Sequence, residues 1–141
     1  MYKKILVALE HGRADDSLLP HVASLASLLG SELLLVHVAD GWAARNFEPL
    51  KLAESEEMKE DREYLETQAS KLREQGLRVS VRLALGNPPS EIIKAAAQES
   101  CDLIAMTTHG HRFFGDLIHG STIEPVRHKS PVPILVVRAG S

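Results

Sequence analysis

The sequence predicts an α/β domain with three layers, in which a five-stranded parallel sheet lies between helices. Two observations lead to this class. Short apolar runs alternate with longer amphipathic stretches along the chain, so that strands and helices take turns from one end to the other. Most of these short runs are almost continuously apolar, as in strands that are buried on both faces of a parallel sheet. Because parallel strands need right-handed crossover connections, we expect helices on both faces.

The first helix is expected at about residues 16–29. Apolar side chains recur there at helical spacing, and Gly30 follows as a typical C-terminal residue. Pro20 fits if Ser17 caps this helix, since the proline then falls in the first turn, where no amide is needed. With a cap at Asp15, one hydrogen bond is lost. We therefore expect the helix to start near Ser17.

The remaining elements follow from the same two patterns. We expect strands at residues 3–9, 32–38, 77–85, 102–108 and 132–138, and helices at 51–75, 90–99 and about 121–129. The strand at 77–85 alternates apolar and polar residues, which is typical of a strand with one exposed face at a sheet edge. No repeat, linker or low-complexity stretch divides the 141 residues, so we expect a single domain over 1–141.

The composition excludes several classes of function. With 44% apolar and 25% charged residues, the chain matches an ordinary globular protein. A net charge of -3 gives no general attraction for nucleic acid or anionic membranes. No apolar run approaches the ~18 residues of a membrane span, and no leader pattern precedes the first strand. The single cysteine, Cys101, fits a reducing compartment and precedes a buried strand, where we expect it to be inert. These features predict a cytoplasmic protein.

A candidate binding site follows the fourth expected strand. Ligands of doubly wound sheets bind beyond the carboxyl ends of the strands, where strand order reverses. The loop there contains Gly110 and, after nine residues, Gly120-Ser121-Thr122. Ser121 and Glu124 form an S-x-x-E capping box, which predicts a helix N-terminus at Ser121. Such a terminus beside two permissive glycines suits an anionic phosphate, although the glycines and the cap also have a purely structural interpretation.

Residues 104–138, IAMTTHGHRFFGDLIHGSTIEPVRHKSPVPILVVR, resemble the C-terminal signature of universal stress proteins. In nucleotide-binding members that signature reads G-x2-G-x9-G-[ST]. Gly110, Gly120 and Ser121 match its second glycine, third glycine and hydroxyl residue, whereas Thr107 stands where the first glycine is expected. The opening MYKKILVALE resembles the family's first strand, with Glu10 in place of the usual aspartate. HVAD and the GNP at 86–88 match further landmarks, so the resemblance covers essentially the whole chain.

The resemblance implies a fold and a set of ligand contacts. The fold is the sandwich of adenine nucleotide alpha hydrolase-like and flavodoxin-like proteins, with strand order 3-2-1-4-5. Val38 would offer its backbone to the adenine edge, and Glu10 would face the base or the ribose. The implied nucleotide-binding residues are Ala8, Leu9, Glu10, Val38, Met106, Thr107, Gly110, His111, Arg112, Gly120, Ser121 and Thr122. The ligand would be ATP or AMP, with Mg²⁺ or Mn²⁺ accompanying bound ATP.

Arg112 is the candidate for a cationic phosphate contact, because a guanidinium forks onto phosphate oxygens; the alternative is a solvated loop arginine. His109, His111 and His119 lack the spacing of a helical metal site, so they are interpreted as lining an anion pocket and no protein metal site is expected. His37, inside an apolar strand, is interpreted as a core histidine with its hydrogen bonds satisfied.

The functional hypothesis is a nucleotide-responsive regulatory protein of the stress response, and not an enzyme. The chain has neither a G-x-S-x-G elbow nor a Walker-type G-x4-G-K-[ST] motif, so at most slow ATP turnover is expected. The main alternative is a dimeric interaction module with a vestigial pocket. A flavodoxin-like enzyme is a third hypothesis, which is less supported because only 4% of the residues are aromatic and could stack on a flavin ring. By analogy with the family, the last strand, 132–138, would pair with its two-fold mate in a homodimer.

Overall fold

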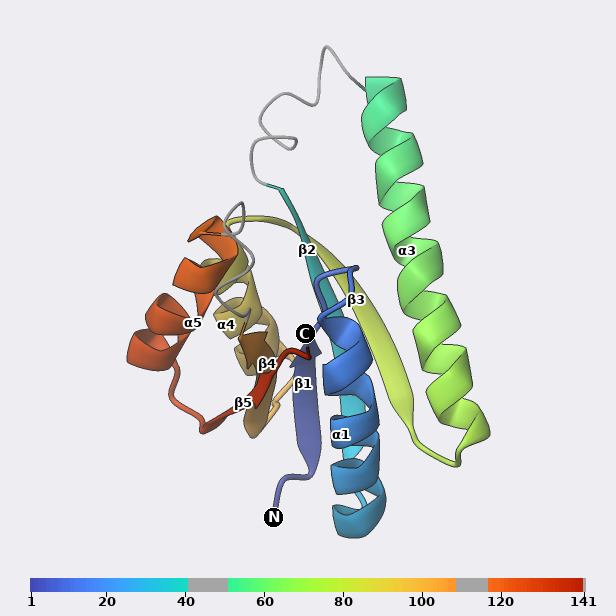
Figure 1. The fold of residues 1–141 in the computed structure, drawn as a ribbon, viewed down its shortest axis with the longest axis vertical. Coiled ribbons are helices and arrows are strands. Elements are labelled where there is room, and N and C mark those ends of the chain that lie inside the picture. The colour runs from blue at the N-terminus through green and yellow to red at the C-terminus, as the bar shows by residue number, and fades with distance from the viewer. Residues whose placement is uncertain (41–50, 109–116, 141) are drawn as a thin grey trace.

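The protein is described by a computed structural model that covers residues 1–40, 51–108 and 117–140 (Figure 1). It contains one five-stranded sheet in which all neighbouring strands are parallel. The strands are β1 (Lys4–Ala8), β2 (Glu32–Asp40), β3 (Val79–Gly86), β4 (Leu103–Thr108) and β5 (Ile134–Arg138). Their order, β3-β2-β1-β4-β5, confirms the expected 3-2-1-4-5 arrangement and places β1 at the centre.

Within the described residues, four helices cover the two faces of the sheet (Figure 1). They are α1 (Asp15–Leu29), α3 (Lys51–Glu74), α4 (Pro88–Gln98) and α5 (Leu117–Lys129). Helices α1 and α3 pack on one face, where they share a buried cluster with every second residue of the central strands. Helices α4 and α5 pack on the other face with the alternate residues. The three-layer α/β/α class predicted from the sequence is therefore confirmed.

The alternation of side chains along β1 builds both halves of the core. Ile5 and Val7 lie in the cluster under α1 and α3, whereas Leu6 lies in the cluster under α4 and α5. All three side chains are fully buried. Burying each such side chain is worth about 1.5–3 kcal/mol, so β1 alone supplies a large share of the apolar contacts that hold the helices to the sheet.

Helix α1 begins two residues earlier than the sequence predicts. Its N-cap is Ala14 and its first residue is Asp15, so the predicted start near Ser17 is wrong. Pro20 consequently lies in the second turn, where the carbonyl of Asp16 loses its helical partner. Both of those residues are exposed, so water can compensate. Ser17 has a different contact: its hydroxyl accepts a 2.8 Å hydrogen bond from the Gly140 amide near the end of the chain.

Two other helix starts also differ from the predictions. Helix α4 begins at Pro88 and not at Ser90, because prolines suit the first helical positions and Asn87 caps the helix by accepting a 3.2 Å hydrogen bond from the Ser90 amide. Helix α5 begins at Leu117, so Ser121 lies inside it and the predicted capping box does not form the N-terminus. A glycine such as Gly120 costs a helix only about 1 kcal/mol, which allows the helix to run through it.

Candidate functional site

A cavity of about 70 Å³ lies at the carboxyl edge of the sheet, between β1, β2 and β4 and the helices α4 and α5. The cavity lies beside β1 and β4, where the strand order reverses. Doubly wound sheets bind their ligands at this point. The described lining residues are Ala8, Leu9, Glu10, Val36, His37, Val38, Pro88, Ile92, Met106, Thr107, Thr122 and Ile123. Most are apolar, and Glu10 is the one carboxylate among them.

Seven of the residues implied by the family resemblance come together in this lining. They are Ala8, Leu9, Glu10, Val38, Met106, Thr107 and Thr122. The backbones of Gly120 and Ser121 lie in the first part of α5, one turn or less before Thr122. Gly110, His111 and Arg112 lie outside the described residues, as does His109. The predicted site residues that are described thus line one cavity, apart from Gly120 and Ser121.

The sequence analysis missed five lining residues. Val36 could have been found, because it lies two residues before Val38 and therefore on the same face of β2. Pro88, Ile92 and Ile123 come from α4 and α5, whose rotation about their axes no local pattern specifies. His37 was interpreted as a core histidine with its hydrogen bonds satisfied; the residue lines the cavity and is only partly buried, and one ring nitrogen lies 3.0 Å from the Leu9 carbonyl.

Thr107 and Glu10, the two positions that depart from the nucleotide-binding signature, are in contact with each other. Thr107 is 3% exposed, and its hydroxyl donates a 3.3 Å hydrogen bond to Oε2 of Glu10. A glycine at position 107 would have no hydroxyl to donate. The longer glutamate side chain is therefore held at the cavity wall by a group that the usual signature lacks.

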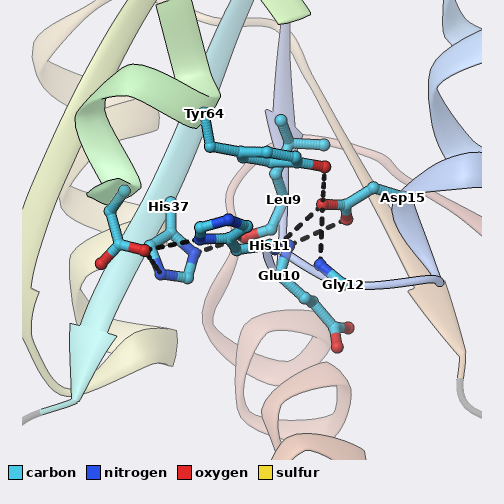
Figure 2. Close-up of polar contacts among 8 residues, drawn as sticks. Leu9, Glu10, His11, Gly12, Asp15, His37 and Tyr64 are labelled. Atoms are coloured by element: carbon cyan, nitrogen blue, oxygen red, sulfur yellow. Dashed lines mark hydrogen bonds and ion pairs between the residues drawn. The ribbon is translucent and has the colours of Figure 1, made fainter. Parts of the chain in front are cut away.

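The turn between β1 and α1 is organised by the buried carboxylate of Asp15 (Figure 2). Its Oδ1 accepts a 2.9 Å hydrogen bond from the Glu10 amide. Its Oδ2 accepts bonds from the amides of His11, at 2.9 Å, and Gly12, at 3.4 Å, and from the Tyr64 hydroxyl, at 2.6 Å. A carboxylate without solvent needs such donors, and bonds to an ionised acceptor are strong. This explains why α1 starts at Asp15.

Tyr64 links this turn to α3. Burial, reinforced by the hydrogen bond to Asp15, raises the pKa of Tyr64, so its hydroxyl stays protonated and keeps donating. The Tyr64 ring stacks on the His11 ring with centroids 4.1 Å apart and an interplanar angle of 21°, as Figure 2 shows. His11 has a left-handed φ of 61°, which is unusual for a residue with a side chain. The stacking and the three amide bonds to Asp15 keep the turn in this conformation.

A second link joins α3 to the cavity wall through Asp61. Its Oδ1 lies 2.7 Å from Nδ1 of His11 and 3.6 Å from Nε2 of His37. The other His37 nitrogen, Nδ1, lies 3.0 Å from the Leu9 carbonyl, which can only accept, so this nitrogen carries a proton. His37 therefore bridges β1, β2 and α3 at the rim of the cavity.

Several other features of the described residues bear on chemistry. Across residues 1–40, 51–108 and 117–140, no three His, Cys, Asp or Glu side chains form a group that could hold a metal ion. Within those same ranges, no helix combines the length and the apolar character that crossing a membrane requires. Burial raises the pKa of the Cys101 thiol to about 11, which leaves it protonated at neutral pH. The described lining of the cavity is mostly apolar, and the Glu10 carboxylate is a hydrogen-bond acceptor within it.

Comparison with known proteins places the whole chain in one family. The model of the universal stress protein family matches residues 1–138. A universal stress protein of Methanocaldococcus jannaschii is 32% identical over 98% of this chain and 96% of its own length. Its solved structure has a TM-score of 0.87 at 30% identity and covers 100% of this chain and 99% of that one.

Two further solved structures share the fold. A universal stress protein of Archaeoglobus fulgidus in complex with dAMP has a TM-score of 0.71 at 22% identity, over 96% of this chain and 98% of that one. A universal stress protein in complex with cAMP has a TM-score of 0.70 at 15% identity, over 99% and 98%. The fold, the family model and the relative that is 32% identical agree, and this chain belongs to the universal stress protein family.

Proposed function

We propose that this protein binds an adenine nucleotide, ATP or AMP, in the cavity at the carboxyl edge, and that it acts as a regulatory protein of the stress response. The observation that carries the proposal is the convergence of seven signature-related residues on one cavity at the switch point of the sheet. The complexes of two universal stress proteins with dAMP and cAMP support the choice of an adenine nucleotide. We propose binding with at most slow hydrolysis, and not catalysis, as the activity.

The proposed arrangement puts the base and ribose at the described part of the cavity. The Val38 backbone would meet the adenine edge, and Glu10 would accept hydrogen bonds from the base or ribose. The phosphates would lie toward Gly110, His111 and Arg112 on one side and residues 120–122 on the other. Mg²⁺ or Mn²⁺ would bind mainly to the phosphate oxygens.

Isothermal titration calorimetry with ATP, AMP and cAMP tests the proposal. The expected result is saturable binding of at least ATP or AMP by the wild-type protein. Gly120→Val should abolish it, because a branched side chain is introduced at the proposed phosphate contact. Glu124→Val is the matched control: it adds the same side chain to the same helix at an exposed position and should leave the affinity unchanged. Absence of heat with all three nucleotides at millimolar concentration would reject the proposal.

One observation favours a second candidate, a nucleotide-independent dimeric interaction module. Thr107 occupies the first signature position, is almost fully buried and hydrogen-bonds Glu10, so the pair can complete the cavity wall without a ligand. In that case the protein would act through its surfaces alone. The calorimetric experiment separates the two candidates.

We also propose that the protein forms a two-fold homodimer through β5. This strand is at one edge of the sheet, and its apolar side chains are only partly covered, with Val136 41% exposed. An apolar edge strand is prone to pair with another chain, and the same strand of a second copy is a self-complementary partner.

A further inference from the structure

The two halves of α3 are attached to the sheet in different ways. The C-terminal half buries Leu65, Ala69 and Leu72 in the core, each 4% exposed or less. Between residues 56 and 64, by contrast, no side chain is buried. Figure 1 shows this end of α3 reaching beyond the carboxyl ends of the strands. Within the described residues 56–74 of α3, fully buried apolar side chains therefore begin at Leu65, and the partly buried Tyr64 packs against the edge of the same core.

The polar and ring contacts described for residues 56–64 all lead to one place. Tyr64 donates to Asp15 and stacks on His11, and Asp61 pairs with His11 and lies near His37. His11 and the amides bound by Asp15 belong to the β1–α1 turn. We call these four residues, His11, Asp15, Asp61 and Tyr64, the α3 clamp.

The same turn forms part of the cavity wall. Leu9 and Glu10 both line the cavity. Glu10 is held at two points: its backbone amide donates a hydrogen bond to Asp15, and its carboxylate accepts one from the Thr107 hydroxyl. In Figure 2 the Glu10 carboxylate points away from the clamp, while the Glu10 backbone amide is hydrogen-bonded to Asp15 of the clamp. A change in the clamp can therefore reach the cavity through Glu10, without any direct contact between α3 and a ligand.

We propose that Tyr64 and Asp61 are positioning residues for the cavity, and that ligand occupancy is coupled to the docking of residues 56–64 of α3 on the β1–α1 turn. The inference rests on the proposed nucleotide binding. With the clamp closed, Glu10 is held where it meets the ligand; with the clamp open, only part of the population is competent to bind, which lowers the apparent affinity. Coupling of this kind is reciprocal, so bound nucleotide must in turn favour the docked helix.

Tyr64→Phe tests the coupling sharply, because it removes the hydroxyl that reaches Asp15 and retains the ring that stacks on His11. The expected result is an ATP affinity about threefold to tenfold below wild type in calorimetry. The matched control is Tyr2→Phe, which removes the chain's other phenol hydroxyl, two residues before the start of β1 and thus at the opposite edge of the sheet. That variant should bind ATP as the wild type does.

Asp61→Asn is a second variant, which leaves the hydrogen bonds of Asp15 in place. Its control is Glu60→Gln, which changes the exposed neighbouring residue. The diagnostic readout is hydrogen exchange with and without ATP. In the wild type, ATP should slow the exchange of residues 56–64 and of the turn at 9–12. In Tyr64→Phe and Asp61→Asn this ATP-dependent protection should shrink, whereas it should persist in both controls. A purely structural role would change exchange without ligand and leave the response to ATP intact.

The outcomes distinguish the two proposals. If the wild type binds none of the nucleotides, the proposed function fails, and the coupling fails with it. If the wild type binds ATP, but both clamp variants bind it equally well and residues 56–64 do not respond to ATP, the coupling is overturned and the proposed function stands. Should Tyr64→Phe fail to fold by circular dichroism, Asp61→Asn decides by the same criteria.

Discussion

The hydroxyl of Thr107, near the end of β4, donates a hydrogen bond of 3.3 Å to the carboxylate of Glu10, just beyond the end of β1. The two strands are neighbours at the centre of the sheet, so the bond closes the cavity wall at the switch point. Each residue differs from the nucleotide-binding signature, but the differences are complementary. The extra methylene of glutamate extends the carboxylate, and threonine supplies a hydroxyl that glycine lacks.

Removal of that hydroxyl should destabilise the fold modestly. Thr107→Val preserves the shape of the side chain and leaves Glu10 without one donor, which we expect to lower the free energy of unfolding by about 0.5–1.5 kcal/mol. Thr108→Val is the control on the same strand. Urea denaturation of Thr107→Val, Glu10→Gln and the double variant gives the coupling energy between the two side chains. A coupling energy near zero would mean that the bond contributes nothing in solution.

The Asp15 carboxylate should contribute far more to the stability of the fold than the carboxylate of the next residue, Asp16. Asp15→Asn replaces one acceptor oxygen by an amide group that faces donors, in a site with no solvent. We expect a loss of about 2–3 kcal/mol in the free energy of unfolding, measured by urea denaturation. Asp16→Asn makes the same chemical change at an exposed position and should cost less than about 0.5 kcal/mol. Equal losses for the two variants would contradict the role assigned to Asp15.

Asp102 should make the stability of the fold decrease at acidic pH. Burial alone would raise its pKa, but hydrogen bonds from the amides of Lys3, at 2.9 Å, and Lys4, at 3.1 Å, lower the pKa of Asp102 overall. A pKa that is lower in the folded state means that the carboxylate stabilises the fold above its unfolded pKa, and that this contribution disappears as the pH falls through the folded value.

Asp102→Asn should therefore be less stable than wild type at pH 6, and the difference should shrink below about pH 4. Thermal unfolding from pH 7 to pH 3 measures it, with Glu57→Gln as an exposed control. A difference that stays constant over this range would show that ionisation of Asp102 is not involved.

The β5 edge should control the oligomeric state. Size-exclusion chromatography with light scattering should give a dimer for the wild type. Val136→Lys places a charge in the proposed strand pairing and should give a monomer. Leu28→Lys changes an apolar residue that is 81% exposed on α1, and should remain dimeric. A monomeric wild type, or a dimeric Val136→Lys, would remove β5 from the interface.

The type of each described helix and strand, and their order along the chain, could be predicted from the sequence, because each depends on a local pattern of residues. The errors arose where distant residues decide. Ser17 looked like the better cap for α1, but Asp15 is fixed by amides of the preceding turn and by Tyr64, which is 49 residues away. Ser121 had the local pattern of a cap, yet α5 starts four residues earlier. Composition and spacing alone could not indicate that Asp61 and His37 would meet at the cavity rim.

The bond between the Gly140 amide and Ser17 has a practical implication for protein engineering. It holds the last described residues beside the start of α1, at the same edge of the sheet as the cavity, whereas the first residues lie at the opposite edge (Figure 1). A fluorescent reporter or affinity tag attached to the C-terminal end of the described residues would emerge at the carboxyl edge of the sheet, where the cavity lies, and one attached to the N-terminal end would emerge at the opposite edge. Ligand studies are therefore best made with N-terminal fusions.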